Sequence, residues 1–425
     1  MSELTRHKFS DLYHMASGIS SKPEQAGHGA PFLSFSAVFN NYFLPNELSD
    51  RMDTSEDEQK KYSINEGDIF LTRTSEVVDE LGMSSVALKS YPQSTYSGFL
   101  KRLRPRKEKL TYPKFMAFYL RSYLFRKAMT NNAVLTLRAS LNEEIFSYVD
   151  LLLPNYGEQV KIGDFLYLLS KKVDCNNRIN AELEAMTRAL YDYWFVQFDF
   201  PDANGRPYKS SGGKMVYNAT LKREIPAGWR VEPLLESCEV VDCLHSKKPS
   251  SSFESEAFYL LQLENILNNG QIDLSSKYFV SRDDYKKWTS RIQIKEHDIV
   301  MTNAGRVAAF AQVPAGVVCG IGRNITAIRP NSIQKNFFFL SLSGRDVQAQ
   351  IISNLDQGAF FKSFNVKGIK VLNLLRPDTD LECAFEQIVT PFIRKRHGVA
   401  SENQQLTQLR DWLLPMLMNG QVTVP

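Results

Sequence analysis

The sequence repeats itself, and this repeat constrains the fold more than any other feature. The stretch "SLNEEIFSYVDLLLP", which ends at Pro154, returns 223 residues later as "SFNVKGIKVLNLLRP", which ends at Pro377. The register between the two copies then holds to the end of the chain, where Leu190 corresponds to Leu413. A period of this kind predicts one structural module that is used twice.

Matching segments continue upstream in the same order. "INEGDIFLTR" (Ile64–Arg73) corresponds to "IKEHDIVMTN" (Ile294–Asn303), and "FLSFSAVFNN" (Phe32–Asn41) corresponds to "LLQLENILNN" (Leu260–Asn269). The offset drifts from 223 to 230 and 228 residues upstream, as insertions in loops would cause. Leu and Asn are common enough to produce one such match by chance, but several matches in the same order indicate an internal duplication.

Each copy is predicted to fold as an α+β domain followed by a long helix. Short apolar runs such as "DIFLTR" and "YSGFLKRLRP" indicate strands, and "PKFMAFYLRSYLFRKAM" indicates a helix. We expect a pseudo-twofold repeat of two similar α+β domains, rich in strands, separated by a pair of long antiparallel coiled-coil helices. The expected segments are a first domain over 1–154, a central spacer helix over 155–197, a linker over 198–228, a second domain over 229–377 and a distal spacer helix over 378–425.

The two predicted helices carry apolar residues in rows spaced by seven, which is typical of a coiled coil. The positions expected to pack between them are Ile162, Leu169, Leu183, Met186, Leu190, Phe392, Leu406, Leu409 and Leu413. Alternatively, each row packs on its own domain. Length favours the pair, because Gly157–Val196 would span about 60 Å at 1.5 Å per residue. In the distal helix, Pro391 and Gly398 predict a bend or break, with Ser401 capping a restart.

The composition is that of an ordinary globular protein, with 43% hydrophobic residues, 23% charged residues and a formal net charge of +4. A chain of 425 residues predicts roughly two to four domains. The five cysteines have no CxxC spacing and no neighbouring histidine pair. This argues against a disulfide framework or a zinc site and favours a reducing compartment. No run approaches the ~20 apolar residues of a membrane span, so we expect a cytoplasmic protein.

A search for catalytic patterns gives no candidate catalytic, cofactor-binding or metal-binding residue. "SSGGKMV" resembles a phosphate loop only superficially, since it lacks the earlier glycine and the Ser or Thr after the lysine. The six histidines are scattered, and none stands in a nucleophile–base motif. Nothing in the sequence therefore argues for an enzyme.

Features typical of nucleic-acid binding are better represented. "KRLRPRKEK" (Lys101–Lys109) holds six basic residues, which could contact phosphates or form a solvated loop. The turn after each "DI" strand is rich in polar side chains that can reach bases or phosphates. There Arg73, a typical guanine reader, corresponds to Asn303, a typical adenine reader. The candidate DNA-binding residues are Thr72, Arg73, Arg102, Arg104, Arg106, Lys107, Arg138, Thr302, Asn303, Arg306, Arg323, Asn324 and Lys362.

The linker carries the most specific resemblance to a known family. "WFVQFDFPDANGRPYKSSGGKMV", with the later "REIPAGW" (Trp194–Trp229), resembles the segment that follows the central helix in specificity subunits of type I restriction–modification systems. "NRINAELEAMTRALYDYWF" resembles the end of that helix, and the resemblance covers essentially the full length. It implies that each domain is a target recognition domain for one half of a split double-stranded DNA site. It also implies that the paired helices set the gap between the half sites.

The same resemblance implies what the chain works with. A specificity subunit is not catalytic. It recruits two methyltransferase subunits, which use S-adenosylmethionine to methylate an adenine in each half site, and two motor-nuclease restriction subunits for cleavage. S-adenosylmethionine, ATP and Mg are therefore expected on the partner subunits, and no cofactor is expected in this chain.

Two other interpretations remain open from the residues alone. One is a nuclease or methyltransferase whose site cannot be recognised from sequence, and the other is a coiled-coil scaffold with two protein-binding modules. The apolar ends of the predicted helices are expected to pack on each other or on the adjoining domain, or else to dock methyltransferase subunits. These ends hold Tyr191, Tyr193, Trp194, Phe195, Trp412, Leu413, Leu414 and Leu417.

Overall fold

The chain divides into two compact units, Met1–Asp174 with Gln405–Pro425, and Cys175–Gln404. The computed structural model describes residues 3–20, 22–75, 82–131, 139–140, 148–304, 306–357, 362–364 and 366–425. Two long helices, α7 (Tyr156–Tyr191) and α12 (Thr379–Met418), contribute residues to both units. Among the described residues, no helix is long and apolar enough to cross a membrane.

The domain of the first unit is built on a four-stranded antiparallel sheet. Its order is β2-β9-β5-β7, with bounds Tyr13–Ser17, Leu100–Pro105, Ile69–Thr72 and Ser84–Val86. A second sheet has the order β4-β3-β8, with bounds Asp50–Met52, Ala26–Leu33 and Thr95–Tyr96. Two short ladders join β1 to β11 and β6 to β10, with bounds Thr5–Lys8, Asp150–Leu153, Thr74–Ser75 and Ala139–Ser140.

Alternation along the strands buries apolar side chains on both faces of the four-stranded sheet. Ile69 and Leu71 of β5 belong to one core, and Phe70 between them belongs to another. The first core also takes in Phe115 of α4 and Ile162 of α7. The short helices of this unit are α1 (Phe9–Leu12), η1 (Pro23–Gln25), α2 (Phe35–Asn40), α3 (Glu56–Lys61), α4 (Pro113–Tyr119) and α5 (Tyr123–Asn131).

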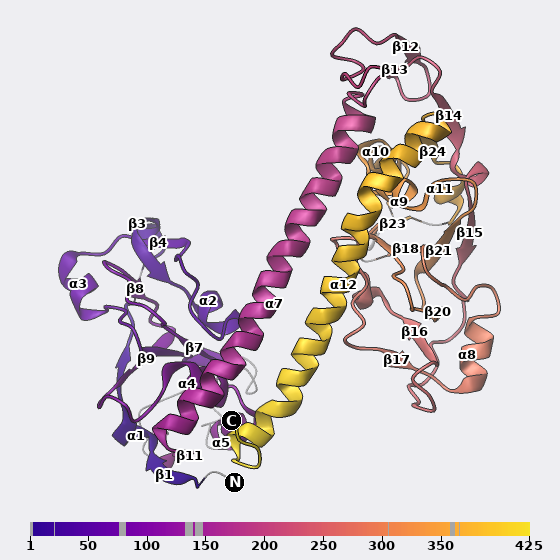
Figure 1. The fold of residues 1–425 in the computed structure, drawn as a ribbon. Coiled ribbons are helices and arrows are strands. Elements are labelled where there is room, and N and C mark those ends of the chain that lie inside the picture. The colour runs from indigo at the N-terminus through magenta and orange to yellow at the C-terminus, as the bar shows by residue number, and fades with distance from the viewer. Residues whose placement is uncertain are drawn as a thin grey trace. The chain divides into compact units, whose positions relative to one another are not determined.

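The domain of the second unit repeats this topology. Its four-stranded sheet has the order β15-β21-β18-β19, with bounds Cys238–Asp242, Ile325–Pro330, Ile299–Thr302 and Phe310–Gln312. The second sheet is β17-β16-β20, with bounds Tyr278–Phe279, Tyr259–Leu261 and Gly320–Ile321. The ladder β14–β24, Arg230–Pro233 with Asn373–Arg376, matches β1–β11. The predicted α+β fold and internal repeat are confirmed (Figure 1).

The remaining elements of the second unit surround these sheets. A ladder joins β22 (Asp356–Gln357) to β23 (Lys362–Ser363). The helical segments are η4 (Leu234–Glu236), η5 (Leu263–Asn265), α8 (Arg282–Trp288), α9 (Lys335–Ser343), α10 (Arg345–Ser353) and α11 (Val366–Lys370).

The linker after α7 is an ordered segment that packs through aromatic rings. It begins with a π-helical turn, η3 (Asp192–Val196), and contains the hairpin β12–β13, Met215–Asn218 with Arg223–Pro226. The Phe200 ring stacks on Tyr208 and on Trp229, with ring centroids 4.7 and 5.2 Å away. Packing of these aromatic rings fixes the path of the chain into the second domain.

α7 and α12 pack against each other in antiparallel orientation, as predicted (Figure 1). Within the second unit, Asn176 contacts Asn403 near one end, whereas Tyr191 contacts Phe385 near the other. Within the first unit, the start of α7 shares its apolar core with Leu417 of α12. Both helices also join the cores of the adjoining domains. The apolar rows of the two helices therefore pack both on the other helix and on the adjoining domains.

The predicted break in the distal helix is wrong, because α12 is continuous from Thr379 to Met418. Pro391 removes a backbone donor, but Gln387, whose carbonyl loses that donor, is exposed to water. Gly398 is exposed as well, and Ser401 lies inside the helix rather than at a cap. Buried side chains on both sides of the proline, such as those of Val389 and Ile393, hold the helix on the second domain.

The predicted packing rows are only partly right. Ile162 is buried, while Leu169, Leu183, Leu190, Phe392, Leu406 and Leu413 are half-buried. Met186 and Leu409 were expected to pack but are 51% and 41% exposed. The row of α7 that was predicted through Met186 is displaced by one residue. The buried side chains spaced by sevens are instead those of Leu166, Asn180, Thr187 and Trp194. The shift was hidden from apolar patterning because polar Asn180 and Thr187 occupy the seam.

Candidate nucleic-acid interface

A buried aspartate anchors the "DI" strand of each domain. Asp68 is fully buried before β5, and Arg104 of β9 donates to its two carboxylate oxygens at 2.8 and 2.6 Å. Asp298, 2% exposed, makes the same paired contact with Arg329 of β21, also at 2.8 and 2.6 Å. The hydrogen bond to aspartate raises the pKa of each arginine. A bidentate pair of arginine and carboxylate fixes the relative orientation of the two side chains and also stabilises their contact. Both domains therefore hold the strand before the turn in the same way, by a pair that we name the brace.

This brace corrects part of the prediction for the basic stretch. Residues 100–105 form the strand β9, as the run "YSGFLKRLRP" predicted, so the alternative of a solvated loop is wrong for these residues. Arg104 is committed to Asp68, and Arg102, only 7% exposed, donates to the carbonyl of Ser63 at 2.6 Å. Arg106 donates to two backbone carbonyls of its own domain. Lys107, beyond the strand, is exposed and remains a candidate for contact with phosphate.

The turn after each "DI" strand makes a matching backbone hydrogen bond in both domains. The amide of Arg73 donates to the carbonyl of Phe99 at 2.8 Å, and the amide of Asn303 donates to the carbonyl of Asn324, also at 2.8 Å. The sequence match between Arg73 and Asn303 is thus a structural match. We name the segments 72–73 with 99 and 302–303 with 323–324 the reading turns.

The threonines of the reading turns shape them from inside. Thr72 and Thr302 are 0% and 1% exposed. Their hydroxyls accept from the amides of Met83 and Ala309 at 2.9 and 3.1 Å. Both threonines are buried and help to shape the turns in this structure, and their contact with DNA stays a prediction.

The outer residues of the reading turns differ between the two domains. In the first, Arg73 is exposed beside Phe99, which is 61% exposed. In the second, Arg323 and Asn324 are exposed. Asn303 is half-buried, and its side-chain oxygen accepts from Thr326 at 2.9 Å. The amide group of Asn303 therefore has a defined orientation, whereas Arg73 offers a full set of guanidinium donors.

Arg306 supports a neighbouring loop. Its guanidinium donates to the carbonyls of Leu263 and Ile266 at 2.9 and 2.7 Å. The residue is nevertheless exposed, and its contact with DNA stays a prediction. Arg138 and the side chain of Lys362 lie outside the described residues.

Sequence reasoning missed a group of cations beside α8 in the second domain. Lys248, Lys277 and Arg282 lie over the rings of Tyr278, Tyr259 and Phe258 at 4.0, 4.8 and 6.0 Å. Aromatic support of this kind holds long basic side chains in place. The lysine beside two aromatic residues in "SSKYF" (275–279) was the available signal, but Lys248 and the ring-bearing residues Phe258 and Tyr259 lie in other segments of the chain.

One group of possible metal ligands occurs among the described residues. Asp242, Cys243 and His245 each offer one atom, and these atoms lie within 4.8 Å of one another. His245 and Asp242 already form a hydrogen bond of 2.8 Å. Burial raises the pKa of the Cys243 thiol, which disfavours the thiolate that a metal requires. A structural zinc site normally has four protein ligands, so these three do not fit one.

Known proteins resemble this chain in sequence. The Type I restriction modification DNA specificity domain matches residues 10–185. The MjaIX type I restriction enzyme specificity subunit of Methanocaldococcus jannaschii is 22% identical over 278 residues, which is 65% of this chain and 61% of that relative. The HindI type I restriction enzyme specificity subunit of Haemophilus influenzae is 21% identical over 451 residues, covering 92% of this chain and 94% of the relative.

A solved structure shares the fold. The crystal structure of a type I restriction–modification S subunit from M. genitalium superposes with a TM-score of 0.58 at 14% sequence identity, covering 98% of this chain and 96% of that one. The sequence matches relate residues 10–185 to the Type I restriction modification DNA specificity domain, and the structural match shows that the chain shares the fold of an S subunit.

Proposed function

We propose that this chain reads a bipartite double-stranded DNA site, with one half site for each domain. The observation that carries the proposal is the pair of reading turns, which share one braced backbone but present different side chains. Arg is suited to guanine and Asn to adenine in the major groove. The two domains would therefore read different half sites by the same geometry.

In this proposal the helix pair sets the gap between the half sites. α7 has 36 residues and α12 has 40, which correspond to about 54 and 60 Å at 1.5 Å per residue. One turn of DNA is about 34–36 Å. Helices of this length suit two readers placed roughly one to two turns apart.

Catalysis would belong to partner subunits. We infer two methyltransferase subunits, which methylate an adenine in each half site with S-adenosylmethionine, and two motor-nuclease subunits that need ATP and Mg. An exposed apolar row on α7 supports a docking role: Ile179, Met186 and Tyr193 are 37%, 51% and 38% exposed and recur every seven residues. That spacing suits packing by a partner helix. The expected cytoplasmic location remains part of this proposal.

Substitution in the reading turns tests the proposal. We expect Arg73→Ala to relax base preference at one position of one half site, by about 1–3 kcal/mol of discrimination. Asn303→Ala should do the same only in the other half site. The measurement is selection of bound sequences from a random DNA library by the chain in complex with its methyltransferase. Loss of preference in both half sites from either substitution would contradict the assignment of one half site to each domain.

A second experiment separates the alternative functions. The purified chain alone, incubated with DNA, Mg and S-adenosylmethionine, should neither cut nor methylate. Modification without partners would favour the enzyme interpretation. DNA affinity that is insensitive to salt would favour the protein-binding scaffold, because phosphate contacts release counterions and make affinity fall with salt.

A further inference from the structure

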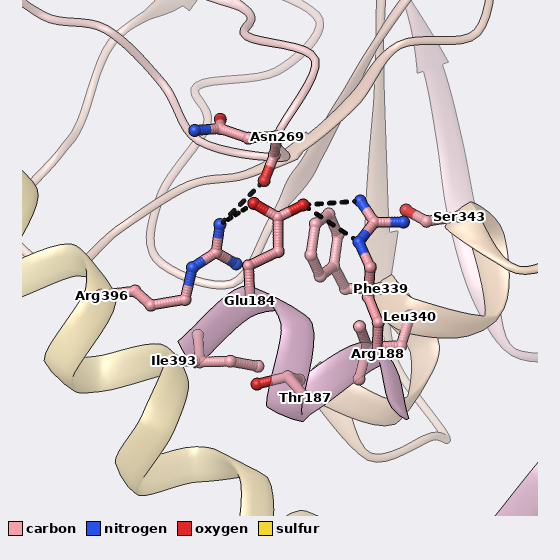
Figure 2. Close-up of a pocket in the computed structure, with 9 residues that line it drawn as sticks. All are labelled: Glu184, Thr187, Arg188, Asn269, Phe339, Leu340, Ser343, Ile393 and Arg396. Carbon is pink, nitrogen blue, oxygen red and sulfur yellow. Dashed lines mark hydrogen bonds and ion pairs between the residues drawn. The ribbon is translucent and has the colours of Figure 1, made fainter. Parts of the chain in front are cut away.

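Arg396 of α12 is a buried cation at the junction between the second domain and the helix pair. Only 6% of it is exposed. Its Nη2 donates to Glu184 Oε2 of α7 and to the carbonyl of Asn269, both at 3.0 Å. Figure 2 shows Glu184 between two guanidinium groups, since Arg188 donates to the other carboxylate oxygen at 3.0 Å. One side chain thus joins both helices to a loop of the domain.

That loop also connects to the reading turn of the second domain. We name residues 263–271 the bracket loop. At its beginning, Arg306 donates to the carbonyls of Leu263 and Ile266. At its end, Arg396 donates to the carbonyl of Asn269, and the buried side chain of Gln271 donates back to the carbonyl of Arg396 at 3.3 Å. The bracket loop is therefore fastened to the segment after the reading turn on one side and to α12 on the other.

This connection is not repeated at the matching positions among the described residues of the first domain. Its matching carbonyl, of Asn41, accepts at 2.9 Å from Arg121, which belongs to the same domain. The helix position that matches Arg396 in the 223-residue register is Val173. The first domain has other charged contacts with the helices: Lys114 of α4 pairs with Asp164 of α7 at 2.7 Å, and Arg410 of α12 lies 5.6 Å from the ring centroid of Tyr42. The contact of Arg396 with the bracket loop is therefore particular to the second copy.

A buried ion pair is a weak source of net stability, but it can impose a single geometry. Burial lowers the pKa of the Arg396 guanidinium, while the Glu184 carboxylate favours its charged form. The apolar contacts of Phe385 and Ile393 already hold the base of the domain on α12. Arg396 adds polar restraints on the bracket loop, through its hydrogen bond to the carbonyl of Asn269 and the hydrogen bond that it accepts from Gln271.

We propose that Arg396 is a positioning residue, which holds the reading turn of the second domain in one orientation to the helix pair and so restricts the gap that the chain accepts. The inference rests on the proposed function, because a gap exists only if the site is bipartite. It predicts that loss of Arg396 changes which gaps are accepted and leaves the bases of each half site unchanged.

The test uses the full chain in complex with its methyltransferase and DNA that carries the two wild-type half sites at varied gaps. We expect Arg396→Met to lower the preference for the wild-type gap over gaps one base pair shorter or longer by about tenfold, within the usual size of coupling effects. Glu184→Gln, which keeps the shape of the side chain, should act in the same direction. Arg396→Lys should restore part of the preference. Arg394→Met, the same change at an exposed position of α12, should have no effect.

The outcomes distinguish the two proposals. Selection detects only folded complexes that bind DNA. If Arg396 had a purely structural role, Arg396→Met would lower the yield and the melting temperature of the protein but leave the gap preference intact. That result would overturn the inference. A changed base preference with an unchanged gap would overturn it too. If Arg396→Met does not fold, Glu184→Gln decides. Failure of the wild-type chain to select any bipartite site would instead refute the proposed function.

Discussion

The role of an arginine in this protein depends on what the fold places beside it. Arg73 and Arg104 both lie in segments that the sequence marks as basic or polar, yet Arg73 is exposed whereas Arg104 is half-buried. Arg104 meets Asp68, which is 36 positions away in the chain. No local pattern reveals such a partner, since the pair forms only when β9 lies beside β5. Its recurrence as Arg329 with Asp298 shows that the brace is part of the module.

The brace can be tested by removing its charge. Asp68→Asn should lower the free energy of unfolding of the first unit by about 2 kcal/mol, the scale of hydrogen bonds to charged groups, because Arg104 keeps only part of its pairing. Asp57→Asn is a matched control, since the Asp57 side chain is 97% exposed and such substitutions change stability by less than about 0.5 kcal/mol. Urea unfolding followed by hydrogen exchange of β5 measures both. Equal effects of the two substitutions would exclude the brace.

At the scale of elements, the sequence predicted which segments are helices or strands better than it predicted which side chains of a helix are buried. The repeat, the α+β domains and the antiparallel helices follow from periods and order. The seam of α7 did not, because its buried positions include Asn180 and Thr187, which hydrophobic patterning reads as surface. The continuity of α12 through Pro391 also escaped prediction, since it depends on packing to the second domain. Tertiary contacts here override local propensity.

Two glycines in the long helices should respond oppositely to alanine. At Gly398 of α12, an added Cβ would meet nothing within 4 Å, so Gly398→Ala should stabilise its unit by about 1 kcal/mol through helix propensity. At Gly163 of α7, the Cβ would lie 2.6 Å from the backbone nitrogen of Phe115, so Gly163→Ala should destabilise by about 1–3 kcal/mol. Urea unfolding gives both signs. Stabilisation by Gly163→Ala would show that α4 does not pack this closely on α7.

At the scale of the whole molecule, the duplication has kept a scaffold and varied what it presents. The sheets, the aspartate–arginine brace and the reading turns recur in both units. The residues that face outward and the fastening of each domain to the helices differ, as Arg396 and Val173 illustrate. This division suits a protein whose two halves read different sequences while the helices between them serve both.

Lengthening the helix pair should then change the gap and nothing else. We expect insertion of one heptad after Asn180 in α7, together with one heptad after Ala400 in α12, to lengthen both helices by about 10 Å. The accepted gap should grow by about three base pairs, since ten base pairs span about 34 Å. A heptad keeps the buried seam on the same face of each helix, so pairing should survive. Selection from a DNA library in complex with the methyltransferase measures gap and half sites together. Altered half sites at an unchanged gap would mean that the helices do not set the spacing.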